Sequence, residues 1–409
     1  MLRRYIAYLE KIFHFDRHVA ALRDSRDGAH VSTRSVWMSV FLMFAFRLPS
    51  FHRLEQDLLR PGMWRRYLKG PPPSADTLGY CLSRFQVKEL RVMLQHHVRT
   101  AGRNKAFRPQ VKGGLRTIAF DGHELFWSTA RCCEKCQVRE VTIKSPKPHT
   151  VKQYYHRVVV AQIVGATPPA ILDVELIGPT EGETVAARRL WTRVVESYGR
   201  LFDVVSADAI YLEAPFLKAV IDAQKRFVVV MKQEARDLYQ DADQLRGSLP
   251  PIEHVDSHRA TTMWDLPDLT TFTTLALPVR VVWSQERTTR RKVVGGKTQE
   301  VTEDKLWVWV TNLTSTEATA ATVQRIGHAR WDVENRGFNE LVHHWAMDHC
   351  FVHDTTAIEV LLLTLALAFL TTYLFYERNL KPEVREPLTR LMLASILASD
   401  IRVTLQPSG

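Results

Sequence analysis

The sequence predicts an α/β fold with a mixed β-sheet, a β-rich insertion, an N-terminal all-helical basic domain and a C-terminal helical segment. Two observations lead to this prediction. Strand-like apolar runs and helical patterns alternate through the middle of the chain, whereas the first hundred or so residues show helical periodicity alone. We expect a helical domain over residues 1–112, a sheet domain over 113–355 and a helical segment over 356–409. A chain of 409 residues can support two or three such domains.

Basic side chains are concentrated in the predicted N-terminal domain. Residues 1–116 carry 22 Lys and Arg against 8 Asp and Glu, a net charge of +14, whereas residues 117–409 carry 33 against 36, a net charge of −3. Helical patterns cover residues 3–15, 36–46 and 88–105, and a proline-rich break precedes a further helix near residues 69–85. The positive charge predicts that this region binds duplex DNA, although basic helices also bind membranes or RNA.

The middle of the chain predicts the strands of the sheet. Residues 154–165 and 170–178 read as two strands joined by a Thr-Pro-Pro turn, and an amphipathic helix over 182–200 precedes strands at 204–206 and 226–232. A β-rich insertion is expected over about residues 237–313. Its apolar runs flank a basic stretch, residues 287–300, in which Gly295 and Gly296 signal a hairpin turn.

Two acids follow short apolar runs in this region. Asp121 ends the run Ile118–Phe120 and is followed by Gly122, which predicts that the chain turns there, at a strand end. Asp208 follows a strand-like run at 204–206, and a helical pattern starts after Tyr211. Since ligands of α/β sheets gather beyond the carboxyl ends of strands, the two carboxylates are expected to converge.

A third acid, Glu334, lies in a segment with helical period, which a capping box of Thr314 and Glu317 is expected to start. Arg330, one turn before Glu334, is a candidate partner for it. The acid therefore falls on or beside an apolar stripe. The stripe consists of Trp331, Phe338, Leu341, Val342 and Trp345.

Three carboxylates in one small volume need a neutralising cation, and Mg²⁺ or Mn²⁺ is the usual one. Asp121, Asp208 and Glu334 together therefore predict a divalent-metal site that cuts DNA, in which two ions activate the attacking water and stabilise the leaving oxygen. Each acid taken alone is equally well explained as a solvated, capping or ion-paired carboxylate.

The segment GHARWDVENRGFNEL, residues 327–341, resembles the third motif of bacterial insertion-sequence DDE transposases, in the branch with the signature Tyr-x2-Arg-x3-Glu-x6-Lys. Arg330 and Glu334 have the spacing of that signature, Gly327 stands at the tyrosine position, and Leu341 or Val342 stands at the lysine position. The residues around Asp121 and Asp208 look like the first two motifs. The resemblance spans roughly residues 113–380 and implies a ribonuclease-H-like core with a β-rich insertion between the second and third acids.

The resemblance implies a transposase that cleaves and joins double-stranded DNA at inverted-repeat ends and in a target, as a homodimer on DNA. Arg330 would orient Glu334 or a phosphate, Tyr211 would contact the DNA backbone, and Trp283 or Trp307 would stack on an unpaired base. Two alternatives remain open: an inactive or repurposed DNA-binding descendant, and a structure-selective nuclease on the same core. Phosphate contacts are expected from the basic stretch of the insertion, at Arg287, Arg290, Arg291, Lys292 and Lys297.

Three of the five cysteines are clustered in the sequence CCEKC. Cys133 and Cys136 have the Cys-x2-Cys spacing of a zinc knuckle, and Cys132 is adjacent. His149 completes the candidate zinc set, with His123 or His156 as alternatives, although a plain thiol cluster explains the same residues. The odd cysteine count and the absence of an export signal argue against a disulfide framework and favour the cytoplasm, near the nucleoid.

The run at residues 360–376 approaches the length that spans a bilayer. Its threonines and the nearby Asp354 and Glu359 favour a buried helix that packs on the catalytic sheet.

Overall fold

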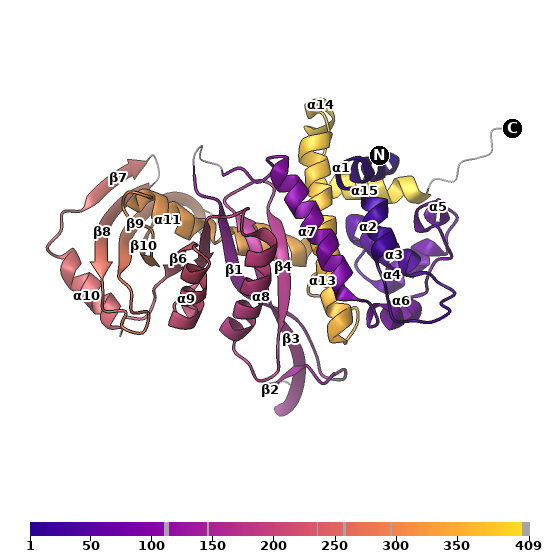
Figure 1. Cartoon of the computed structure of the whole chain (residues 1–409), viewed down its shortest axis with the longest axis horizontal. Coiled ribbons are helices and arrows are strands. Elements are labelled where there is room, and N and C mark those ends of the chain that lie inside the picture. The colour runs from indigo at the N-terminus through magenta and orange to yellow at the C-terminus, as the bar shows by residue number, and fades with distance from the viewer. Residues whose placement is uncertain (110–113, 145–146, 235, 257–258, 295–296, 403–409) are drawn as a thin grey trace. The chain divides into compact units, whose positions relative to one another are not determined.

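The computed structural model describes residues 1–109, 114–144, 147–234, 236–256, 259–294 and 297–402. Contacts divide the chain into two compact units (Figure 1). The first unit comprises Met1–Lys112, Gly122–Leu201 and Asp332–Gly409, and the second comprises Gly113–Asp121 and Phe202–Trp331. The predicted α/β class is confirmed, because the described residues form helices together with ten strands of a mixed sheet.

Helices from both ends of the chain pack together in the first unit. The N-terminal set is α1 (Leu2–Phe13), α2 (Phe15–Ala21), α3 (Thr33–Ala45), α4 (Phe51–Leu58), α5 (Trp64–Leu68), α6 (Ala75–Leu82) and α7 (Val87–Arg103). The C-terminal set is η2 (Val333–Phe338), α12 (Asn339–Trp345), α13 (Thr355–Leu374), η3 (Phe375–Asn379), α14 (Pro382–Arg385) and α15 (Arg390–Arg402).

Helix α13 is the centre of this packing, as the buried-helix prediction required. It contacts α3, α6, α7 and strand β4 (Ala170–Ile177). Its threonines satisfy buried polar groups, since Trp37 Nε1 donates to Thr364 Oγ1 at 3.0 Å and the hydroxyls of Tyr5 and Thr371 are 2.8 Å apart. Among the described residues, Thr355–Asn379 alone is long and apolar enough to cross a membrane, and 94% of its apolar window is buried inside the protein.

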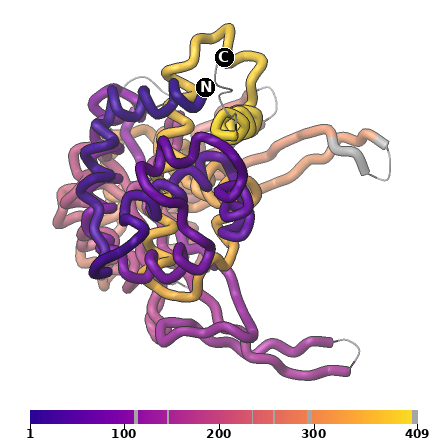
Figure 2. The backbone as a smooth tube through the Cα atoms, turned by 90° about the vertical axis from the view of Figure 1, so that its right-hand side faces the viewer, coloured from indigo at the N-terminus to yellow at the C-terminus, as the bar shows by residue number. Residues whose placement is uncertain are grey.

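Strands β2 (Gln137–Ile143), β3 (His149–Val164) and β4 form the antiparallel part of the first unit. The predicted pairing of β3 with β4 is confirmed, and the predicted amphipathic helix is α8 (Glu183–Tyr198), which packs on both strands. Figure 2 shows the β2–β3 hairpin as an extended two-stranded arm.

Strand β1 (Thr117–Ser128) is longer than predicted, because it continues through Gly122 where a turn was expected. A Cβ on Gly122 would lie much closer to the carboxylate of Glu183 than real side chains approach. The glycine therefore permits close approach of a neighbouring side chain and does not mark a turn. The prediction that Asp121 ends a strand was wrong.

The second unit carries the parallel strands. The first residues of β1 pair in parallel with β5 (Val204–Ala207), and β5 pairs in parallel with β6 (Arg226–Val230). Antiparallel strands β10 (Lys297–Thr311), β9 (Val279–Val294), β8 (Arg259–Leu269) and β7 (Ile252–Asp256) follow β6 in that order. This is the predicted ribonuclease-H-like mixed sheet with its β-rich insertion. Strands β9 and β10 form the second long arm in Figure 2, and Gly295 and Gly296, the predicted turn, lie outside the described residues.

Helix α11 (Ala320–Ala329) packs on the strands of the second unit, where Val323 and Ile326 join a core that contains Val228 and Trp309. The short turn η1 (Ala209–Tyr211) and helix α9 (Ala214–Asp222) follow β5, and α10 (Asp237–Arg246) packs on β8. The strands of the insertion therefore share an apolar core with β5, β6 and α11.

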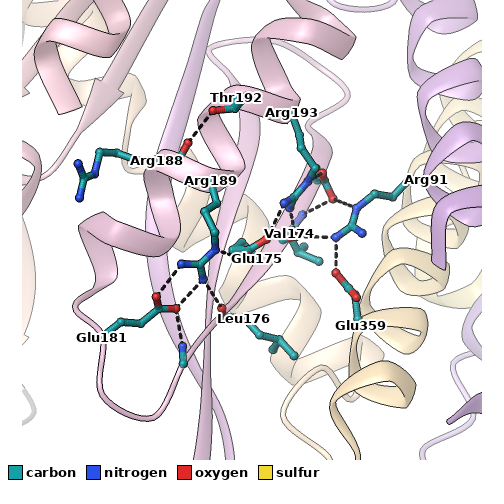
Figure 3. Close-up of polar contacts among 12 residues, drawn as sticks. Arg91, Val174, Glu175, Leu176, Glu181, Arg188, Arg189, Thr192, Arg193 and Glu359 are labelled. Atoms are coloured by element: carbon teal, nitrogen blue, oxygen red, sulfur yellow. Dashed lines mark hydrogen bonds and ion pairs between the residues drawn. The ribbon is translucent and has the colours of Figure 1, made fainter. Parts of the chain in front are cut away.

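An arginine network joins four elements of the first unit (Figure 3). Arg91 of α7 forms ion pairs with Asp173 of β4, at 3.1 Å, and with Glu359 of α13. Arg193 of α8 also pairs with Asp173, at 2.8 Å. Asp173 is buried, and two arginines on different helices, Arg91 and Arg193, neutralise its charge.

Candidate active site

Asp121 and Asp208 stand at equivalent positions of two neighbouring strands that pair in parallel. In the register of β1 and β5, Phe120 is paired with Ala207, and each of these residues directly precedes one of the acids. Adjacent strands lie about 4.8 Å apart, so the two carboxylates emerge side by side. The predicted convergence of the first two acids has this physical basis, although Asp121 lies inside a strand.

Arg330 contacts Asp121 in the structure. Its Nη1 lies 3.1 Å from Asp121 Oδ2, and its guanidinium is 4.6 Å from the ring centre of Trp331. Only 2% of Arg330 is exposed. A buried guanidinium next to a carboxylate fixes the orientation of both groups.

Lys232 is a site residue that the sequence analysis did not identify. It follows β6, the parallel neighbour of β5, and its Nζ lies 2.8 Å from Asp208 Oδ1. Burial raises the pKa of the Asp208 carboxyl, but the Lys232 hydrogen bond and the charge of Arg330 outweigh burial, so the pKa lies below its ordinary value. Asp208 is therefore ionised at neutral pH. The signal in the sequence was the position of Lys232 as the last residue of the strand predicted over 226–232.

Glu334 is half-buried and belongs to the π-helical segment η2 of the first unit. Its flanking residues fasten η2 to the end of β3. The carboxylate of Asp332 accepts from the Gly165 amide at 2.9 Å, and Arg336 Nη1 donates to the Ala166 carbonyl at 3.1 Å. A local π-helix is a conformation that recurs at functional sites.

The predicted start of the Glu334 helix was wrong in detail. Thr314 and Glu317 do form the reciprocal capping bonds, at 2.9 and 3.3 Å, but they close a turn. Helix α11 begins later, at Ala320, and its N-cap is Thr319, whose hydroxyl accepts from the Thr322 amide.

The tyrosine position of the third motif has no room for a side chain, and Leu341, one of the two residues that can stand at the lysine position, is apolar and buried. A Cβ on Gly327 would overlap the indole of Trp309, which is fully buried. Leu341 is also fully buried, in α12. Core packing thus replaces the hydroxyl of the signature, whereas Val342, the other residue that can stand at the lysine position, is partly exposed.

The predicted DNA contacts of the insertion lie on the β9–β10 arm, where the described arginines face acids. Arg287 pairs with Asp304 at 2.8 Å, Arg290 with Glu303, and Arg291 with Glu300 at 3.7 Å. The side chains of Lys292 and Lys297 lie outside the described part of the chain.

Two aromatic predictions need correction. Tyr211 is completely buried, and its ring packs 5.2 Å from that of Phe216, so it does not reach DNA. Trp283 is also buried, against Tyr239, and cannot stack on a base, whereas Trp307 is partly exposed.

The cysteine cluster differs from the predicted set. Cys133 and Cys136 converge with His156 and His353, and their ligand atoms all lie within 4.8 Å of one another. The other predicted ligands fall outside this group. Cys132 and His149 are exposed, with His149 Nδ1 bonded to the Lys147 carbonyl, and His123 stacks on Phe338. Spacing identified the cysteine pair, but His353 is more than two hundred residues away in the sequence.

Two carboxylates at adjacent strand positions, flanked by Arg330 and Lys232, form a site that can bind a divalent cation and a phosphate. Residues 112–371 match a family model described as "Transposase DDE domain", and this range contains Asp121, Asp208, Arg330 and Glu334. The search of curated proteins found no match to the chain.

Proposed function

Because the chain belongs to the family with a transposase DDE domain, we propose that it cleaves DNA at the inverted-repeat ends of an insertion sequence and joins those ends to target DNA. The observation that carries the proposal is the pair Asp121 and Asp208 on adjacent parallel strands. Proteins of this family use divalent metal ions, and we assign Mg²⁺ or Mn²⁺ to this chain.

Asp121, Asp208 and Glu334 would hold the metal ions, which activate water and stabilise the leaving oxygen when bound. Arg330 holds the carboxylate of Asp121 in place through its 3.1 Å contact. Lys232 balances the charge of Asp208 and is exposed, so it can turn from the carboxylate to a DNA phosphate. Glu334 follows Arg330 by four residues in the chain, which supports its assignment as the third acid.

The helical N-terminal region is the proposed contact with duplex DNA. Its helix α7 lines a pocket of about 860 Å³ together with residues 195–201 of the first unit. The lining of this pocket carries more positive than negative charge. It includes three exposed arginines, Arg99, Arg103 and Arg200, and one exposed acid, Glu196. An excess of arginine on a concave surface suits a phosphate backbone.

A homodimer on DNA is the proposed assembly, since two ends of the element must be brought together before they are joined to one target. The proposed location is the cytoplasm, on the nucleoid, where that DNA lies.

The test is cleavage and joining of labelled duplexes that cover the DNA on each side of the gene, with Mg²⁺ or Mn²⁺. We expect Asp121→Asn, Asp208→Asn and Glu334→Gln each to lower the cleavage rate about a thousandfold, because a bound metal contributes several kcal/mol to the transition state. Asp222→Asn is the matched control, an exposed acid at the end of α9. Because Asp208 is a proposed metal ligand, the Asp208→Cys variant should cleave DNA faster with Mn²⁺ than with Mg²⁺. A cysteine thiolate is a softer ligand than a carboxylate and binds Mn²⁺ better than Mg²⁺.

Each outcome separates the proposal from its alternatives. Cleavage and joining that are lost together in the three variants support the proposal. Cleavage without joining indicates a nuclease, and binding of the end DNA without chemistry indicates a repurposed or inactive protein. Activity that survives Asp208→Asn contradicts the site assignment.

A further inference from the structure

Four side chains outside the carboxylate site form a closed set of metal ligands in the first unit. Cys133 and Cys136 lie on the connection between β1 and β2, His156 lies on β3, and His353 directly precedes Asp354, the N-cap of α13. We propose that these four residues bind a structural Zn²⁺ ion.

The distances from Cys136 Sγ and His156 Nε2 to their neighbours in this set are close to those of a tetrahedral zinc site. Cys133 Sγ and Cys136 Sγ are 3.6 Å apart, and His156 Nε2 lies 3.4 Å from the first and 3.5 Å from the second. The His353 ring nitrogens lie 3.7 Å from Cys136 Sγ. Ordinary Zn–S and Zn–N bonds at a tetrahedral angle place two sulfurs about 3.8 Å apart and a sulfur and a nitrogen about 3.6 Å apart.

Disulfide formation and simple hydrogen bonding explain the cluster less well. The two sulfurs are far beyond the roughly 2.05 Å of a disulfide bond, and both thiols are free. Cys136 Sγ has four polar neighbours, namely the Cys133 amide at 3.2 Å, the Cys133 sulfur and two imidazoles. A thiol is one weak donor and one weak acceptor, whereas a metal-bound thiolate accommodates such a set.

Charge and burial point to a structural ion. Two thiolates, two neutral imidazoles and Zn²⁺ have no net charge, which suits the burial of Cys136 and His156. Four protein ligands leave no position for water or substrate, in contrast to a catalytic zinc. The ion would fasten the β1–β2 connection and β3 to the start of α13, which lies about two hundred residues further along the chain.

The first test is the metal content of the full chain after expression with added zinc and purification without chelators. We expect about one zinc per chain in the wild type. Cys133→Ser and His353→Asn should lose most of it, while Cys132→Ser and His149→Asn should retain it. These controls are matched, because Cys132 is adjacent to Cys133 but exposed, and His149 is an exposed histidine on the same strand as His156.

Cobalt substitution keeps the test decisive if a variant folds poorly. Co²⁺ in the wild type should give the visible bands of tetrahedral coordination and a thiolate charge-transfer band. His353→Cys should still bind the ion, since three cysteines and one histidine also form zinc sites, and should strengthen the charge-transfer band. Wild-type protein without zinc and without a cobalt spectrum would overturn the proposal, as would equal loss of zinc from Cys132→Ser and Cys133→Ser.

Discussion

At the scale of single residues, Gly327 gives the sharpest prediction. Its missing Cβ leaves the space that Trp309 occupies, and Trp309 stacks on Trp307 with ring centres 6.0 Å apart. Gly327→Ala should lower the free energy of unfolding by about 1–3 kcal/mol, the usual cost of overpacking a core, although alanine favours a helix. Denaturant unfolding measures the change.

Gly79→Ala is the control for this substitution. Gly79 also lies in a helix, α6, but a Cβ there would contact Val352 at an ordinary 3.7 Å. This variant should be neutral or slightly more stable than the wild type. If both variants unfold at the same denaturant concentration, the close packing of Trp309 against Gly327 does not constrain position 327.

The residues of the carboxylate site were only partly predictable. Asp121 and Asp208 could be found because each follows an apolar run, a property of local sequence. The contacts of Lys232 with Asp208 and of Arg330 with Asp121 could not be found in this way, because they depend on which segments become neighbours in the fold. Helical spacing placed Arg330 beside Glu334, but it gave no sign of the contact between Arg330 and Asp121, which are 209 residues apart in the chain.

At the scale of elements, the buried Asp173 should matter more than any exposed ion pair. Asp173→Ala removes the buried carboxylate that Arg91 and Arg193 share, and leaves Arg91 paired with Glu359 and Arg193 paired with Glu175. We expect a loss of about 3 kcal/mol in the free energy of unfolding, as for other buried pairs that lose one member. Thermal and denaturant unfolding of the full chain provide the measurement.

Asp304→Ala is the contrasting variant. Asp304 pairs with Arg287 on the β9–β10 arm, where both side chains are about two-thirds exposed, at 66% and 67%. Solvent screens such a pair, so no measurable loss of stability is expected. Equal effects of the two variants would show that the network of Figure 3 does not join its four elements as proposed.

Most elements could be predicted from period and turn residues, and the exceptions have a common cause. The β3–β4 pair, α8, the insertion and α13 follow from local patterns. The continuation of β1 through Gly122 and the π-helical form of η2 do not. Both depend on partners distant in sequence, since Glu183 occupies the space beside Gly122, and a Cβ on Gly337 of η2 would overlap Gln162 of β3.

At the scale of the whole molecule, the charge distribution predicts how the chain binds duplex DNA. The net +14 of residues 1–116 includes Arg99 and Arg103, which are exposed in the pocket beside α7. Two histidines of this pocket contribute no charge at neutral pH. Burial and neighbouring charges lower the pKa of His18 to about 4, and burial lowers that of His96.

The double variant Arg99→Ala, Arg103→Ala should therefore weaken duplex binding and reduce the dependence of log K on log salt concentration by about 1.8, since each phosphate contact contributes roughly 0.9. Fluorescence anisotropy of a labelled duplex over a salt series measures this slope. Lys218→Ala, an exposed cation on α9, should leave the slope unchanged. The pKa of His18, lowered to about 4, keeps this histidine neutral between pH 8 and pH 6, so it should add no affinity for DNA over that range. An unchanged slope in the arginine double variant would move the duplex contact to another surface of the chain.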